Sequence, residues 1–170
     1  MNNSSIQKPE ELNSNVVELL LQRLQKEYDH HYFYQAASNW CFGVGYKKAG
    51  EYFLAESNEE LEHARGLENY LIDWNIIPTL PIIGRPTLEF SDLAEVIEKA
   101  YDNEYEAYEA YEDVSVSIFD LRELCTFDFL KDYRKFQKDA VKTYSDMLNV
   151  LDGVNRDSKF EMLVLQEQLF

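Results

Sequence analysis

The residues best suited to chemistry are glutamates and a histidine at helical spacing. Glu60 and His63 lie three residues apart in the segment ESNEELEHARGL, so on a helix their side chains share one face. A lone Glu-x-x-His pair is more often part of a solvated helix surface. Here, however, three further segments each place one such polar side chain within an otherwise apolar stripe: Glu27, Glu104 and Gln137. The pattern predicts one polar layer inside a bundle of four helices.

A buried layer of this composition predicts metal binding. Burying an unpaired carboxylate costs several kcal/mol, and a single histidine cannot neutralise three glutamates. Oxygen-rich ligands with one imidazole favour iron or manganese, whereas structural zinc sites prefer thiolates or more histidines. Two divalent ions against three carboxylates leave one positive charge, and two trivalent ions with an oxo bridge leave the same charge. We therefore expect a di-iron centre that can lose two electrons without a change in net charge.

Helical periodicity predicts four long helices and one short one. A capping box at Asn15 and Glu18 is expected to start the first helix, and Ser91 is expected to cap the third. The predicted stripes cover residues 20–41, 49–74, 93–118 and 130–151, and a short fifth helix is expected at 157–168, packed on another element or another subunit.

The segment from Asn75 to Ser91 holds three of the four prolines, which indicates a long connection rather than a helix. Long connections join parallel neighbours, whereas an up-and-down bundle needs only short loops. The sequence thus predicts an all-α four-helix bundle with one long crossover and a short C-terminal helix.

The composition favours one helical domain. The 170 residues include 45% hydrophobic residues, enough to form a core over a single domain spanning residues 1–170, with residues 1–13 expected to be a flexible tail. Cys41 and Cys125 are far apart, so we expect two small buried residues and neither a disulfide framework nor a thiolate metal site.

The charge balance favours cations as partners. A formal net charge of −16 and a pI near 4.5 argue against nucleic acid and against anionic membranes. The chain shows no signal peptide at its start and no run of about 20 apolar residues, so a cytoplasmic location without membrane insertion is expected.

Two motifs resemble those of a known family. EYDHHYFYQAASNWC (residues 27–41) and YFLAESNEELEHA (residues 52–64) are similar to the first- and second-helix signatures of the non-haem ferritins that carry a ferroxidase centre, and the resemblance spans residues 14–169. The resemblance implies that the predicted four-helix bundle has the ferritin-like arrangement.

The resemblance also implies a set of ligands. Glu27, Glu60 and His63 correspond to ligands of a first iron, with Glu60 bridging. Glu104 corresponds to a ligand of the second iron, and Gln137 to the glutamine beside it. Because the fourth helix offers no anionic ligand here, we expect the second iron to be held more weakly, so that oxidised iron leaves for storage.

The function implied by the resemblance is iron storage and detoxification. Fe(II) would be oxidised to Fe(III) by O₂ or H₂O₂, and ferric mineral would form inside a homo-oligomeric shell of 24 subunits. Glu59 and Glu62 match positions proposed for mineral nucleation or iron transit, although Arg65 replaces a further acid found in some relatives. No haem is expected, and bacterioferritins and rubrerythrins are disfavoured because the fourth helix lacks a Glu-x-x-His pair.

Some positions depart from the family pattern. Phe127 and Leu130 stand where animal ferritins have an acidic threefold channel, and Phe136 and Ala140 replace acids of a third iron site, although Asp139 remains. We therefore expect neither that channel nor a strong third site.

Other side chains near the predicted layer allow two interpretations. His31 lies one turn from Glu27, and packing or an interface role is favoured over metal binding. Tyr34 matches a family tyrosine beside the centre, with core filling as the alternative, and Trp40 is expected in the core, with electron donation as the alternative.

Two other functions remain open at this stage. A di-iron oxidase or peroxidase that stores no mineral is disfavoured by the lack of electron-transfer cysteines. A structural shell subunit or binding bundle without catalysis is disfavoured by the complete ligand set. The sequence does not determine the oxidant, the route of iron uptake or the fate of the mineral.

Overall fold

The computed structural model describes residues 12–170 and consists of five α-helices. Helix α1 spans Ser14–Val44, α2 Lys47–Asp73, α3 Leu93–Asp120, α4 Leu124–Leu151 and the short α5 Lys159–Leu169. No strand occurs among the described residues, so the predicted all-α class is confirmed. None of these helices is long and apolar enough to cross a membrane.

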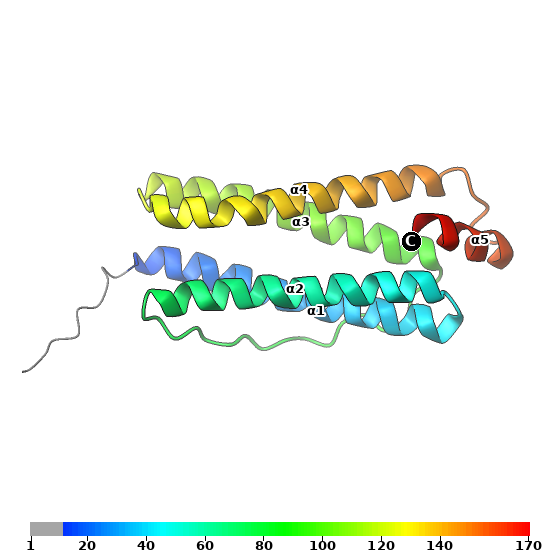
Figure 1. Cartoon of the computed structure of the whole chain (residues 1–170), viewed down its shortest axis with the longest axis horizontal. Helices are drawn as coiled ribbons and strands as arrows, with labels where there is room; N and C mark the ends of the chain where they lie inside the picture. Colours follow the sequence, from blue (N-terminus) through cyan, green and yellow to red (C-terminus); the bar gives the residue numbers. More distant parts are fainter. Residues whose placement is uncertain (1–11) are drawn as a thin grey trace, which may run out of the picture.

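The long helices form two antiparallel pairs joined by a crossover (Figure 1). A tight turn at Gly45, whose φ of 94° lies in the left-handed region that suits glycine, reverses the chain between α1 and α2. After α2 the connection runs back along the whole bundle, so that α3 starts near the start of α2 and runs parallel to it (Figure 1). The predicted long crossover between the second and third helices is therefore confirmed.

The helix starts differ in detail from the sequence prediction. Asn13 caps α1, because its side chain accepts a hydrogen bond from the Asn15 backbone N–H at 2.9 Å, so the assignment of the cap to Asn15 was wrong. Asp92, and not Ser91, caps α3 by accepting from the Glu95 N–H at 2.7 Å. The Ser91 N–H instead donates to the Glu95 carboxylate, which further fixes the start of the helix.

The core consists of two apolar clusters at opposite ends of the bundle. One contains Phe53, Ile97 and Leu151, and the other contains Leu20, Leu67 and Ile118. Each cluster draws on side chains that recur every three or four residues along the helices, as burial of one helix face requires. The polar layer lies between the two clusters.

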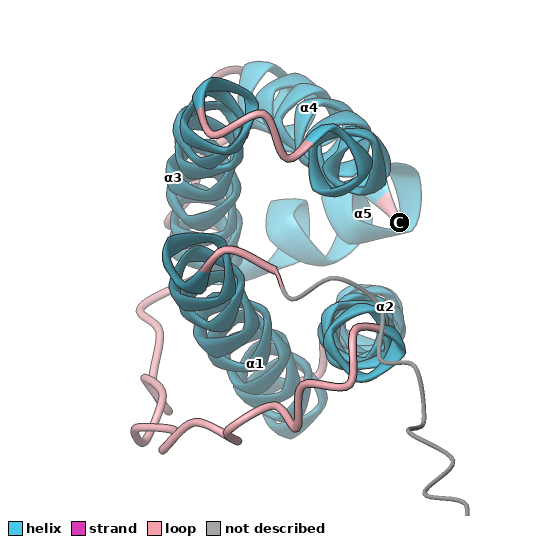
Figure 2. Ribbon diagram, turned by 90° about the vertical axis from the view of Figure 1, so that its left-hand side faces the viewer, coloured by secondary structure: helices cyan, strands magenta, loops and turns pink. Residues whose placement is uncertain are grey.

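The two ends of the chain are described to different extents. Most of the predicted flexible tail, residues 1–11, lies outside the described residues, while Leu12 is buried in one cluster. At the other end α5 lies across the end of the bundle (Figure 2) and packs on α2 of the same chain. Gln166 of α5 accepts a hydrogen bond from the Ala49 N–H, and Lys159 donates to the Val44 carbonyl at 2.7 Å.

The two cysteines differ. Cys41 is buried, and burial raises the pKa of its thiol to about 12. Cys125 is exposed in the first turn of α4, so the prediction that it is buried was wrong. Cys125 lies on the outward face of this turn, whereas the next residue, Thr126, is fully buried and pairs with Tyr70 of α2.

Candidate metal centre

The predicted polar side chains converge midway along the bundle. Glu27 of α1, Glu60 of α2, Glu104 of α3 and Gln137 of α4 are each at most 5% exposed, and His63 of α2 is partly buried beside them. Each belongs to a stripe that is apolar above and below, so the packing of the two clusters forces these side chains inward. One helix contributes each glutamate, as the spacing predicts.

Potential ligand atoms form two groups that share Glu60. Glu27, Glu60 and His63 each offer an atom within 4.8 Å of the others, and so do His30, Glu60 and Glu104. A carboxylate has two oxygens and can bridge two cations. The geometry therefore suits a pair of metal ions, with Glu60 between them.

The sequence analysis missed His30. It named one histidine as the only cationic side chain of the layer, but His30 of α1 is 7% exposed and lies in the second group. A signal was present, because Glu27 and His30 have the same Glu-x-x-His spacing as Glu60 and His63. Burial lowers the pKa of His30, so its ring is neutral, the form that binds metal.

Three oxygen atoms of the layer are buried without a hydrogen-bond partner: Glu27 Oε2, Glu104 Oε2 and Gln137 Oε1. Buried polar atoms are nearly always satisfied in folded proteins, and an unsatisfied one calls for an explanation such as an ion. Metal cations are the partners that carboxylate and amide oxygens commonly take in such a layer. This donor set fits iron or manganese.

Two tyrosines hold the carboxylates in place. Tyr34 donates a hydrogen bond to Glu104 Oε1, and Tyr111 donates one to Glu27 Oε1. In both pairs the tyrosine binds one oxygen and the second oxygen is the unpartnered one. Tyr34 thus contacts one predicted ligand of the layer, and Tyr111, which lies within the stripe predicted for residues 93–118, contacts another.

His63 is the positive charge of the metal-free layer. Its Nδ1 lies 3.4 Å from Glu27 Oε2 and 3.4 Å from Glu60 Oε2. Burial acts to lower the pKa of His63, but the carboxylates of Glu27 and Glu60 beside its ring outweigh burial and raise it to about 10. Burial likewise acts to raise the pKa of Glu27, and the contact with His63 reverses this, so that the pKa lies below its ordinary value.

The other two carboxylates, those of Glu60 and Glu104, are not fully neutralised by His63. Burial raises the pKa of Glu60 well above its ordinary range, and the charges of Glu27 and Glu104 add to this effect. Burial also raises the pKa of Glu104 to about 7. Without metal the layer holds more carboxylates than one imidazolium can neutralise, and protons take up the difference.

His31 does not belong to the layer. Its Nδ1 lies 2.7 Å from the Ser57 carbonyl oxygen and 2.9 Å from Ser57 Oγ, and the same hydroxyl donates to the His31 carbonyl. Trp40 is half-buried against Phe90 and Tyr46. His31 therefore joins α1 to α2, in line with the packing role that the sequence favoured.

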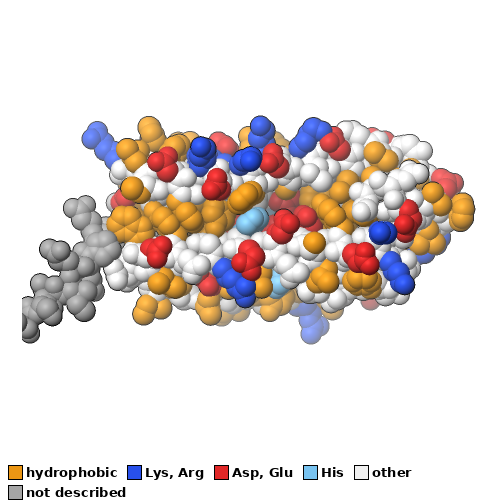
Figure 3. Space-filling view, viewed as in Figure 1, with side chains coloured by type: hydrophobic (Ala, Val, Ile, Leu, Met, Phe, Trp, Pro, Cys, Tyr) orange, Lys and Arg blue, Asp and Glu red, His pale blue; other side chains and the backbone are white. Residues whose placement is uncertain are grey.

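A cavity of about 610 Å³ leads from the solvent to the layer between α2 and α4. Figure 3 shows histidine and acidic side chains at this place, midway along the molecule and flanked by hydrophobic side chains. Glu59 and Glu62 line the cavity together with Glu60 and His63. Glu62 is ion-paired with Arg65 at 2.8 Å, so of the two acids Glu59 is the one without such a pair in the described structure.

The positions that depart from the family pattern are apolar in three dimensions as well. Leu130 is buried in a core cluster and Phe127 packs against it, beneath Arg134. Phe136 lines the cavity mouth and stacks on His63 with ring centroids 4.9 Å apart. Asp139 also lines the cavity, without a second acid at the neighbouring positions 136 and 140.

Comparison with known proteins gives one family. The family model described as ferritin-like domain matches residues 17–154. A probable bacterial non-heme ferritin-like protein of Haemophilus influenzae is 28% identical over 153 residues, which cover 90% of this chain and 93% of the relative. The bacterial non-heme ferritin of Campylobacter jejuni is 29% identical over 122 residues, or 72% of this chain and 73% of the relative.

A solved structure shows the same fold. The open pore ferritin of the archaeon Archaeoglobus fulgidus superimposes with a TM-score of 0.87 over 93% of this chain and 97% of its own, at 20% sequence identity. The four-helix bundle with a short C-terminal helix is thus an arrangement that this chain shares with a ferritin.

Proposed function

Because the chain belongs to the ferritin-like domain family, we propose that it stores iron: it oxidises Fe(II) at the metal centre and deposits the Fe(III) as mineral inside a hollow homo-oligomeric shell. The observation that carries this proposal is the pair of ligand groups sharing Glu60. The unpartnered oxygens of Glu27, Glu104 and Gln137 support it, because they leave ligand positions directed at the same layer.

Different residues of the centre bind each of two Fe(II) ions. Glu27 and His63 bind the first ion, Glu104 with Gln137 binds the second, and Glu60 bridges them. Tyr34 and Tyr111 keep their hydrogen bonds to the outer carboxylate oxygens, so that the inner oxygens stay directed at the metal. Preorganised ligands of this kind lower the cost of assembling the site.

Protons leave the centre as iron binds. His63 and Glu60 hold protons in the metal-free protein, and both must lose them before they can bind Fe(II). Two Fe(II) ions then supply the two electrons that reduce O₂ with two protons to H₂O₂, or H₂O₂ with two protons to two waters. The three buried carboxylates balance the added positive charge.

The outer cavity is the proposed path for iron. Its acidic lining raises the local concentration of Fe(II), and Glu59 is better placed than Glu62 for nucleation or transit because Arg65 neutralises Glu62. The net charge of −16 acts in the same direction. By family resemblance we also propose a cytoplasmic location.

The surface favours association with further copies of the chain. The crossover exposes Ile77 and Ile82 at more than 90% each, together with Leu80 and Leu88. Exposed apolar patches of this kind mark interfaces. By family resemblance we propose a shell of 24 subunits.

Two substitutions test the oxidation step. Glu60→Ala removes the shared ligand and His63→Ala removes a ligand of the first ion, so each should slow the fast phase of Fe(II) oxidation, followed by stopped-flow absorbance, while the shell still assembles. Glu51→Ala on the exposed face of α2 is the control for loss of a charge and should leave the rate unchanged. An unchanged initial rate in both site variants would refute the assignment of the centre.

Sedimentation tests the storage claim separately. A large hollow assembly is expected for the purified protein, with an electron-dense core after loading with Fe(II). A monomer or dimer as the only species would refute storage and leave the oxidation step to be judged by its own experiment.

A further inference from the structure

His30 is a buried histidine with an unused nitrogen. The ring lies on the α3 side of α1, and its Nδ1 is buried without a hydrogen-bond partner. A buried imidazole that only filled space would be expected to satisfy this nitrogen, because a buried polar atom without a partner costs about 1–3 kcal/mol. The unsatisfied Nδ1 indicates that a partner for the ring is missing from the metal-free protein.

The neighbours of His30 point to the nature of that partner. A ring nitrogen lies within 4.8 Å of ligand oxygens of Glu60 and Glu104, and Glu104 Oε2 is itself buried without a partner. A buried carboxylate oxygen without a partner, in a group that also holds an imidazole and a second carboxylate, is the arrangement expected around a cation.

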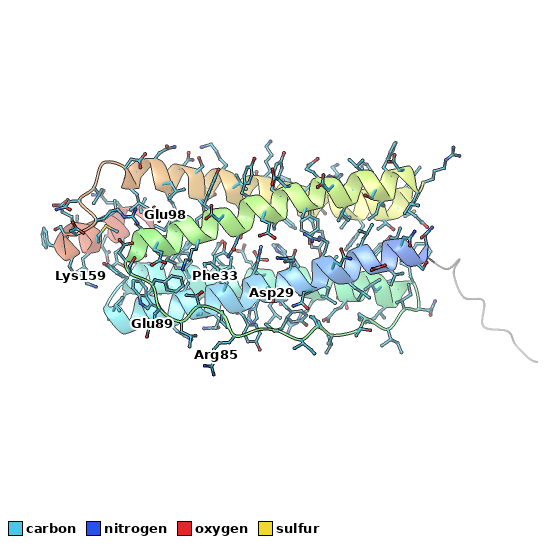
Figure 4. The ribbon with its side chains drawn as sticks, turned by 180° about the vertical axis from the view of Figure 1, so that it is seen from behind. Asp29, Phe33, Arg85, Glu89, Glu98 and Lys159 are labelled. Atoms are coloured by element: carbon cyan, nitrogen blue, oxygen red, sulfur yellow. The ribbon has the colours of Figure 1, made fainter. Side chains whose placement is uncertain are left out.

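The outer side of His30 offers no competing partner. There the ring lines a surface cavity of about 270 Å³ with Lys26, Asp29 and Glu106, and no hydrogen bond to His30 is formed within the described structure. Lys26 and Glu106 pair with each other at 3.0 Å, and Asp29 accepts a hydrogen bond from Gln25. Figure 4 shows this back face, where the crossover carrying Arg85 passes α1 near Asp29 and Phe33.

We propose that His30 is a nitrogen ligand of the second metal ion, a proposal that rests on the proposed di-metal function of the same centre. The second ion is then bound by His30 and Glu104, and the first by His63 and Glu27, with Glu60 shared. Each ion receives one imidazole and one carboxylate of its own. The second Glu-x-x-His pair of this chain, Glu27 to His30, comes from α1 rather than from α4.

This arrangement changes the expected balance of the two sites. Gln137 supplies only a neutral oxygen to the second ion, and the sequence alone predicted weak binding there. An imidazole from His30 adds a ligand to the second ion, so that the two ions bind with more similar affinities than the sequence alone predicted.

Anaerobic titration with Co(II), followed by its visible absorption, tests the proposal. The wild-type shell should bind two Co(II) per subunit. In His30→Ala the affinity for the second Co(II) should fall by more than about tenfold, since loss of even an outer partner of a metal ligand costs ten- to a hundredfold. The first site should be unchanged. Asp29→Asn, which alters the outer cavity but no ligand, should bind as wild type.

Added imidazole distinguishes ligation from core packing. Imidazole can fill the space left in His30→Ala from the adjoining cavity, and it should restore the second Co(II), whereas a loss of packing alone would not respond. Unchanged binding of two Co(II) by His30→Ala would overturn the proposal for His30 while leaving the di-metal centre intact. Failure of the wild type to bind Co(II) would instead contradict the proposed function.

The wild-type protein provides a second test that needs no variant. In crystals soaked with Zn(II), the second anomalous peak should lie about 2.0–2.1 Å from a ring nitrogen of His30. A second peak more than about 3.5 Å from both ring nitrogens would overturn the proposal.

Discussion

Replacing Glu104 by glutamine should stabilise the metal-free protein at alkaline pH. The amide oxygen of the introduced glutamine can still accept the hydrogen bond from Tyr34, so the packing is kept and only the charge is removed. Burial raises the pKa of Glu104 from 4.5 to about 7. The folded protein therefore binds this proton more tightly than the unfolded chain does, and the stability that the proton contributes is fully present below pH 4.5 and lost as the pH rises through 7.

The size of the effect follows from the two pKa values. With 4.5 in the unfolded chain and about 7 in the folded protein, ionisation of Glu104 costs roughly 1 kcal/mol of stability at pH 5 and about 3 kcal/mol at pH 8.5. The stability of Glu104→Gln relative to wild type should thus rise by about 2 kcal/mol between these pH values. Ionisation of Glu104 in the metal-free centre therefore destabilises the folded protein.

Guanidinium unfolding of chelator-treated protein, at equal subunit concentration for both forms, measures this difference. Added Zn(II) should reverse the order, because a ligand at a hundredfold its Kd stabilises by about 2.7 kcal/mol per site and the variant lacks one carboxylate of the second site. A difference between variant and wild type that stays constant from pH 5 to 8.5 would refute the burial of an ionisable Glu104 in an unbalanced layer.

Three further outcomes are expected. Binding of Zn(II) at pH 7.5 should release at least the proton of His63, whose pKa is about 10, and binding should become tighter at higher pH. Calorimetry in two buffers of different ionisation enthalpy measures the released protons. Binding without proton release would contradict the assignment of His63 as an imidazolium. Tyr111→Phe removes the hydrogen-bond donor to Glu27, so the free energy of unfolding should fall by about 1–3 kcal/mol and Zn(II) should bind more weakly at the first site. An unchanged free energy of unfolding would count against that hydrogen bond. Gly66→Ala would ordinarily favour a helix by up to about 1 kcal/mol, but here the new Cβ would clash with Tyr133 Oη. The thermal unfolding midpoint should therefore fall, and it should recover when Tyr133→Phe is added. A midpoint at or above that of wild type for the single variant would show that the tyrosine side chain moves away freely.

The periodicity of the sequence predicted the bundle and the inward direction of most candidate ligands. Glu27, Glu60 and Glu104 interrupt apolar stripes, and a helix has only one way to bury such a stripe, so their convergence follows from spacing alone. The long proline-containing connection predicted the crossover for a similar reason, because its length permits parallel neighbours.

The choice between His30 and His31 could not be made from spacing. At 3.6 residues per turn, positions three and four after Glu27 lie about 60° to one side and about 40° to the other side of it. Which side faces the centre depends on where α2 and α3 pack. The structure places His31 against Ser57 of α2 and His30 near Glu104 of α3, and only this tertiary arrangement separates the two roles.

The caps and Cys125 were mispredicted for local reasons. Asn13, Ser14 and Asn15 are all good capping residues, and the same holds for Ser91 and Asp92, so propensity does not choose among neighbours. Cys125 lies on the outward face of the first turn of α4, next to the fully buried Thr126, and the tendency of cysteine to be buried does not reveal which face a residue occupies.

Anomalous diffraction from crystals soaked in ferrous salt, measured at the iron edge, shows whether two iron ions bind at the proposed centre. Two peaks per subunit are predicted, one among Glu27, Glu60 and His63 and the other beside Glu104, with Glu60 between them. No iron peak between these side chains, or iron bound only at the acidic surface around Glu59, would contradict the assignment of the centre.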